Sequence, residues 1–283
     1  MSTEISQPAD VLSSLARIKS SNLIIYADTP KLFEEIDPDA MDVILNAYHA
    51  AYIRYMEQVC GDDRSHTQLT AFPQANIVIT HNPDVFRSLY PEPSRFDKLP
   101  DWVRGYVNTN MYVRWLKDRE TFPTDNIDGS AHEFIHVIIP EVLGLPTEYL
   151  DSAWPLWIHE ALAVGLNQQR PIDWLRREIQ QPTIIIPTIA SIEKNGIFHH
   201  DRRPPKNNIA YQYCCFVSEE VGTAIKTTLY PELPNISSLM AICALTQRAY
   251  RNDVPTFADA LDSIGVDTIP AENRCRKRLG IAA

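Results

Sequence analysis

The chain has 283 residues, of which 36 are acidic and 26 basic, so its formal charge at pH 7 is −10. This length allows one large domain or two subdomains around a sizeable core, and the acidic balance argues against a nucleic-acid-binding surface. No run of about 18 apolar residues occurs, and the N-terminal stretch from Met1 to Ser21 lacks the apolar segment of a signal peptide. We therefore expect a cytoplasmic protein with no membrane partner.

The cysteines agree with that compartment. The chain contains 5 of them, at irregular spacing, and an odd and irregular set indicates free thiols in a reducing environment. Cys214 and Cys215 are neighbours in a helical run, which favours two small buried residues.

The first 125 residues predict an N-terminal subdomain that contains a sheet. Residues 8–19 carry apolar side chains at helical spacing, and a longer amphipathic pattern runs from Pro38 to about Cys60. Short apolar runs rich in β-branched residues predict strands between these helices. The remaining expected elements are strands over 22–26, 75–80 and 106–113 and a short helix over 83–90.

The most informative stretch is His132-Glu133-Phe134-Ile135-His136. Two histidines four positions apart on a helix lie on one face, so both imidazoles can reach one metal ion. Glu133 can then point at the open side of that metal as a general base. Apolar neighbours predict a buried helix that ends at Pro140 and Gly144. The alternative is a helix with two satisfied core histidines.

A third metal ligand is expected further along the chain. Position 142, where metzincins would place a histidine, is Val142. Glu160, in contrast, lies in an apolar, helix-forming run from Trp154 to Ala163. A lone carboxylate in such a run needs a partner, and a zinc ion would be one.

Together the two motifs resemble those of the gluzincin metallopeptidases. A catalytic H-E-x-x-H helix followed by W-x-x-E-A-x-A, here from Trp157 to Ala163, is most similar to the bacterial peptidase MA-like group, which is related to thermolysin and the aminopeptidase N-like enzymes. That family usually has glycine after the ligand glutamate, where this chain has Ala161. The resemblance implies Zn²⁺ held by His132, His136 and Glu160, with Glu133 as the base.

The resemblance also implies a mechanism and a substrate. Zinc with three protein ligands keeps a fourth position for water and lowers the pKa of that water to about 7. Glu133 would take the proton as the water attacks a peptide carbonyl and pass it to the leaving amine. Tyr211 would donate to the oxyanion, or else be a packing tyrosine. The expected partner is a peptide or protein substrate.

The strand over 106–113 has two interpretations that the sequence leaves equal. It is either an ordinary strand or the sheet edge that holds an extended peptide by strand addition, and polar Asn108 and Asn110 suit an exposed edge. Aminopeptidase relatives carry a glutamate on this strand to hold the substrate's amino terminus. Because no glutamate occurs here, the resemblance favours an endopeptidase.

We therefore expect a mainly α, α+β fold of the thermolysin-like zincin type with a small mixed sheet. Residues 1–125 would form the sheet-containing subdomain and residues 126–283 a helical subdomain that carries the zinc site, within one catalytic domain. A long helix should start near Asn208, and residues 234–265 should give two more. The basic residues between Arg274 and Arg278 predict a solvated helix end.

Two other functions remain open from the sequence. A catalytically inactive relative could bind peptides or a partner protein, although a structural zinc site needs no base such as Glu133. A zinc hydrolase could instead act on a non-peptide amide. The sequence does not distinguish the second of these from a peptidase.

Overall fold

A computed structural model describes residues 8–19, 22–35, 38–58, 74–90, 105–108, 111–116, 127–150, 155–167, 172–180, 186–195, 209–233 and 236–281. The chain is mainly helical and has one small mixed sheet of five strands, which confirms the expected α+β class. It divides into two compact units, residues 1–50 with 69–138 and residues 51–68 with 139–283. The helices α3 (Pro38–Gln58) and α6 (Ile127–Leu143) cross this division, whereas the sequence predicted one boundary between residues 125 and 126.

The sheet belongs to the first unit and has the strand order β1-β2-β3-β5-β4. Its three inner strands run parallel, and each edge strand pairs antiparallel with its neighbour. The strands are β1 (Ala16–Lys19), β2 (Leu23–Ala27), β3 (Ala75–Thr80), β4 (Gly105–Asn108) and β5 (Met111–Trp115). β2 and β3 lie where the sequence predicted strands.

Two expected elements of this unit are wrong in part. The helix predicted over 8–19 is a short helix, α1 (Pro8–Ser14), followed by the edge strand β1. Pairing of β1 with β2 overrides the apolar spacing, and only the first part of that spacing faces the core. The strand predicted over 106–113 is a hairpin of β4 and β5, so only β4 lies at the sheet edge.

Each face of the sheet is covered by helices. On one face, α4 (Pro83–Ser88) packs its buried Phe86 against Val78 and Val113, and residues of α1 join the same cluster. On the other face, the ring of Phe134 on α6 meets Tyr48 of α3 and Tyr112 of β5 edge-on, at centroid distances of 5.3 and 5.7 Å. The first half of α6 is therefore fixed against the sheet. A further short helix, α2 (Pro30–Glu35), precedes α3.

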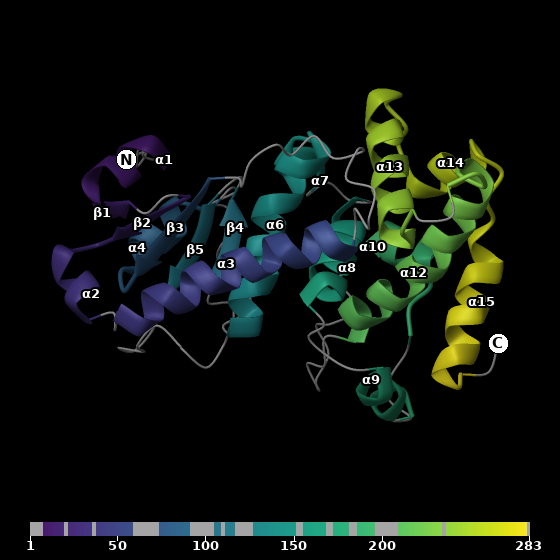
Figure 1. Ribbon diagram of the computed structural model, residues 1–283, viewed down its shortest axis with the longest axis horizontal. Helices are drawn as coiled ribbons and strands as arrows, with labels where there is room; N and C mark the ends of the chain where they lie inside the picture. Colours follow the sequence, from purple (N-terminus) through teal and green to yellow (C-terminus); the bar gives the residue numbers. More distant parts are fainter. Residues whose placement is uncertain are drawn as a thin grey trace, which may run out of the picture. The chain divides into compact units, whose positions relative to one another are not determined.

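The second unit is built from helices around α12 (Ile209–Leu229), which starts where the sequence predicted a long helix (Figure 1). α12 packs against α8 (Pro155–Asn167), α13 (Ser238–Arg251) and α15 (Thr268–Leu279). The described helices that complete the unit are α7 (Thr147–Leu150), α9 (Ile172–Ile179), α10 (Ile189–Asn195) and α14 (Phe257–Asp262). α13 and α14 are the two helices expected within 234–265.

Side chains from one helix satisfy backbone groups at the ends of another. Arg176 of α9 donates to the carbonyl of Arg278 near the C-terminus of α15, at 2.8 and 3.0 Å. Glu193 of α10 accepts from the backbone N–H of Phe257 at the start of α14, at 2.8 Å. Such bonds replace the partners that helix ends lack, so they fix how these helices join.

Four of the five cysteines lie among the described residues. Cys214, Cys215, Cys243 and Cys275 are buried and form no disulfide bond with one another, and Cys60 lies outside the described residues. Across the described ranges, no helix has the length and apolar character needed to cross a bilayer.

Candidate metal centre

Among the side chains of α6 that the structure describes between residues 130 and 140, His132 and Glu133 of the H-E-x-x-H motif are the accessible ones. From residue 130 to residue 140 every side chain is buried except His132 and Glu133, which are half-buried. The helix continues through Pro140 to Leu143, so the predicted end at Pro140 is wrong, while Gly144 has a positive φ of 60° and does end it. Proline removes only one helical hydrogen bond, and the buried Ile138, Ile139 and Leu143 keep the last turn in place.

The two histidines of α6 face each other. Their Nε2 atoms are 3.1 Å apart, and the rings lie nearly perpendicular at 74°. Two nitrogens that bind one zinc ion at about 2.0–2.1 Å in a tetrahedral arrangement lie about 3.3 Å apart. The observed separation therefore fits two imidazoles on one metal ion, as the four-residue spacing predicted.

Glu160 lies on α8, a buried helix made mostly of apolar residues. Every residue from 157 to 164 is buried, and Glu160 itself is 7% exposed. The ring of Trp157 stacks edge-on against Phe257, and α8 packs along α12 so closely that a methyl group at Gly165 would lie 3.0 Å from the sulfur of Cys215. The carboxylate is thus held on a well-packed helix.

His132, His136 and Glu160 together form a possible metal-binding group. Each offers one ligand atom, and these three atoms all lie within 4.8 Å of one another. Two imidazole nitrogens and one carboxylate oxygen are ligands that zinc accepts, although other divalent metals accept them too. The donor set and the spacing fit a metal ion with three protein ligands.

The surroundings of Glu133 include two residues that the sequence did not single out. Tyr112 and Arg114 stand two positions apart on β5 and therefore on the same face of the sheet. Burial raises the pKa of Tyr112 to about 12, the positive charge of Arg114 opposes that rise, and the carboxylate of Glu133 adds to it. Tyr112 therefore stays protonated near neutral pH, close to Glu133. A tyrosine and an arginine alternating with apolar strand residues was the signal available in the sequence.

Tyr211 cannot be placed beside this group. It lies in α12, but its side chain is outside the part of the chain that the structure describes. Its assignment as an oxyanion donor stays a prediction.

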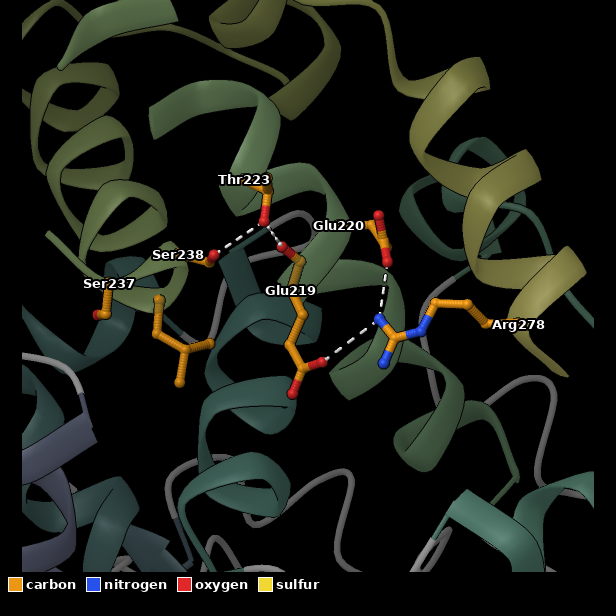
Figure 2. A pocket seen from close by; sticks show the side chains of 7 residues that line it. Glu219, Glu220, Thr223, Ser237, Ser238 and Arg278 are labelled. Carbon is orange, nitrogen blue, oxygen red and sulfur yellow. Dashed lines mark hydrogen bonds and ion pairs between the residues drawn. The ribbon is translucent and has the colours of Figure 1, made fainter. Parts of the chain in front are cut away.

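A second cluster of charged residues lies in the second unit, between α12, α13 and α15. It lines a cavity of about 380 Å³, shown in Figure 2, with Glu219, Glu220, Thr223, Ser238 and Arg278 around it. Arg278 reaches Glu220 at 2.7 Å and Glu219 at 3.8 Å, and Arg274 reaches Glu220 at 3.0 Å.

The basic end of α15 is solvated, as the sequence predicted, and it also forms ion pairs with α12. Arg274 and Arg278 are about half-exposed, yet both bind Glu220 of α12. Burial opposes the ionisation of Glu220, but hydrogen bonds from Arg278 and Arg274 outweigh it and hold the pKa of Glu220 below its usual value. Glu219 differs, because burial raises its pKa despite the nearby Arg278. The sequence did not pair these residues, which lie more than 50 positions apart.

Comparison of the chain with protein-family models and with curated proteins finds no match.

Proposed function

We propose that this protein is a zinc-dependent metallopeptidase of the thermolysin-like gluzincin type, which hydrolyses peptide bonds. One observation carries the proposal: the ligand atoms of His132, His136 and Glu160 lie within 4.8 Å of one another. The residue after the first of these histidines is Glu133, one of the two half-buried residues on an otherwise buried stretch of helix.

Three residues would bind the metal ion, and Glu133 would transfer the proton. His132 and His136 would bind the metal through neutral imidazoles, and Glu160 would add one negative charge. Zinc held there supplies a Lewis acid and lowers the pKa of water at its open position to about 7. Glu133 would accept a proton from the attacking water and return it to the leaving amine. Its partial exposure is what a base that must reach a substrate requires.

The sheet edge supports a peptide as the substrate. β4 is an edge strand, so the main-chain groups on its outer side can bind an extended chain by strand addition. Main-chain hydrogen bonds of this kind tolerate many side chains. Neither β4 nor β5 contains a glutamate that could hold an amino terminus, and this favours an endopeptidase over an aminopeptidase.

The test combines metal analysis with cleavage of a peptide library. The purified chain should carry close to one zinc per molecule, and a chelator should abolish cleavage until zinc is restored. Glu133→Gln keeps the side-chain size but removes the proton acceptor, so zinc content and Tm should change little while turnover falls by about 10²–10⁴-fold. Glu34→Gln, at an exposed glutamate of α2, serves as the matched control and should keep full turnover.

Each alternative predicts a different result. A protein that takes up no metal is not a metallopeptidase. A peptide-binding relative would bind zinc and peptide, and Glu133→Gln would leave its affinity unchanged with no turnover in either form. Hydrolysis of small amides without cleavage of any peptide would indicate a non-peptide amide hydrolase. Equal cleavage rates for the wild type and Glu133→Gln would rule out the proposed base.

A further inference from the structure

The second unit contains a further cavity, of about 490 Å³, where α12 and α13 end. A methyl group at Gly222 of α12 would collide with Ser238, so α13 begins beside residue 222. The cavity lies farther along both helices, because Leu229 at the end of α12 and Arg251 at the end of α13 both line it. The two helices therefore run in the same general direction, and the cavity lies between their C-terminal ends.

The cavity wall carries two positive charges. Its lining on α13 is a strip at helical spacing, Ala244, Gln247, Arg248 and Arg251, so both guanidinium groups belong to one side of the helix. Of the described residues that line the cavity, none is acidic. No described residue forms an ion pair with either arginine. The hydrogen-bond donors of both guanidinium groups are therefore available to a ligand.

Helix ends explain why arginines are favourable here, but they do not balance the charge. The C-terminus of a helix carries about half a negative charge, so α12 and α13 together contribute about −1. The end of α6 reaches the same place, since the side-chain amide of Gln247 donates to the carbonyl of Leu143 at 2.6 Å. Two guanidinium groups outweigh even these three helix ends, which sum to about −1.5. A local positive balance thus remains in a chain whose formal charge is −10.

Hydrogen bonds that leave the guanidinium groups free hold the wall of the cavity in place. The side-chain amide of Asn252 donates to the carbonyl of Arg248 at 2.8 Å and closes the end of α13. The backbone N–H of Tyr230 donates to Lys226 at 2.9 Å, and its carbonyl accepts from Leu233 at 3.0 Å. A wall fixed in this way lowers the entropy that a bound ligand must lose.

We propose that this cavity binds a small anion with at least two negative charges, of the phosphate monoester or dicarboxylate class, through Arg248 and Arg251. The planar guanidinium fork matches the oxygen pairs of phosphate and carboxylate and donates two parallel hydrogen bonds. Tyr230 adds a hydroxyl donor, and Leu229 and Ala244 offer apolar contact to the carbon part of such a ligand. The volume lies in the range of about 300–1,000 Å³ that is usual for small-molecule sites.

The test is calorimetric titration of the full-length chain with inorganic phosphate, succinate and acetate at constant ionic strength. Arg248→Gln combined with Arg251→Gln should weaken the binding of phosphate or succinate by about tenfold or more, because hydrogen bonds to charged groups are lost. The matched control combines Arg17→Gln with Arg177→Gln, at exposed arginines of β1 and α9. It has the same net charge and should keep the affinity within about twofold. Any anion bound at the candidate metal centre affects both double variants equally.

Binding of phosphate, of succinate or of both, weakened only in the cavity variant, supports the proposal and identifies the class of anion. No saturable binding of either anion, or equal affinities in the two double variants, overturns it. Acetate that binds as tightly as the dianions overturns the requirement for two charges. If the cavity variant does not fold, Arg248→Lys with Arg251→Lys keeps both charges and removes the fork. That variant should still bind phosphate and succinate more weakly, and an unchanged affinity would overturn the proposed contacts.

Discussion

The carboxylates of Glu220 and Glu160 have different neighbours. Around Glu220 the neutralising charge belongs to the chain, since Arg274 and Arg278 reach its carboxylate at 3.0 and 2.7 Å. Glu160 instead lies within 4.8 Å of ligand atoms of His132 and His136. Imidazoles that are neutral add no charge to a carboxylate, but they do add donors for a metal ion.

This difference separates a structural cluster from a candidate metal centre. Two arginines pair with the charge of Glu220, whereas a His–His–Glu group can bind a cation and leave a coordination position open. Both clusters contain a buried or partly buried glutamate, so the glutamate alone does not distinguish them. The neighbouring side chains distinguish them, because they are arginines in one cluster and histidines in the other.

The largest expected difference between the two clusters is in metal binding. Glu160→Ala should weaken zinc affinity by about 100-fold or more, since even the loss of residues that support a ligand costs up to about that much. Glu220→Ala should leave zinc affinity unchanged. Competition with a chromophoric chelator measures both variants, and far-UV circular dichroism checks that each remains folded. Equal zinc affinities for the two variants would remove the distinction.

The second largest expected difference is in how much an added methyl group destabilises the helix packing near each cluster. A methyl group at Gly222 of α12 would collide with the main-chain carbonyl of Ser238 on α13, whereas at Gly165 of α8 it would meet only the sulfur of Cys215. A side chain can rotate away and a backbone cannot. Gly222→Ala should therefore destabilise the protein by about 3 kcal/mol and Gly165→Ala by about 1 kcal/mol. Urea unfolding measures both, and the reverse order would show that the α12–α13 contact is looser than described.

The smallest expected effects concern the pH dependence of stability within the second cluster. The folded-state pKa of Glu220 is lowered, so its contribution is present above its unfolded value of 4.5 and is lost as the pH falls through the lowered pKa. The folded-state pKa of Glu219 is raised, so its ionisation costs stability as the pH rises above 4.5. The two neighbouring glutamates therefore act in opposite directions.

Single substitutions separate these two directions. At pH 7, Glu220→Gln should lower the free energy of unfolding by about 0.5–1 kcal/mol, and Glu219→Gln should raise it slightly. At a pH below both pKa values the two variants should approach the wild type. Chemical unfolding at several pH values provides the measurement, and changes of the same sign at pH 7 would contradict the assigned pairing with Arg278.

The sequence predicted best where the pattern is local. The helix of His132 and His136, the strands over 22–26 and 75–80 and the start of α12 all follow from the spacing of apolar residues within one element. It failed where pairing with a distant segment decides the outcome. Residues 16–19 continue a helical pattern of apolar residues, yet they form a strand because they pair with β2. Residues 106–113 have the pattern of a single strand, yet they contribute to two strands that pair with each other.

Within the candidate centre, the sequence by itself determined the chemistry of the donors and the spacing of the two histidines, because helical periodicity fixes which residues share a face. The resemblance to gluzincins added Glu160. Only the tertiary structure decided that Arg114 and Glu133 both act on Tyr112, and that Glu220 binds arginines 54 and 58 residues away. The reason is that side-chain contacts across a sheet or between helices depend on strand register and helix packing, and no short-range pattern of residues encodes either one.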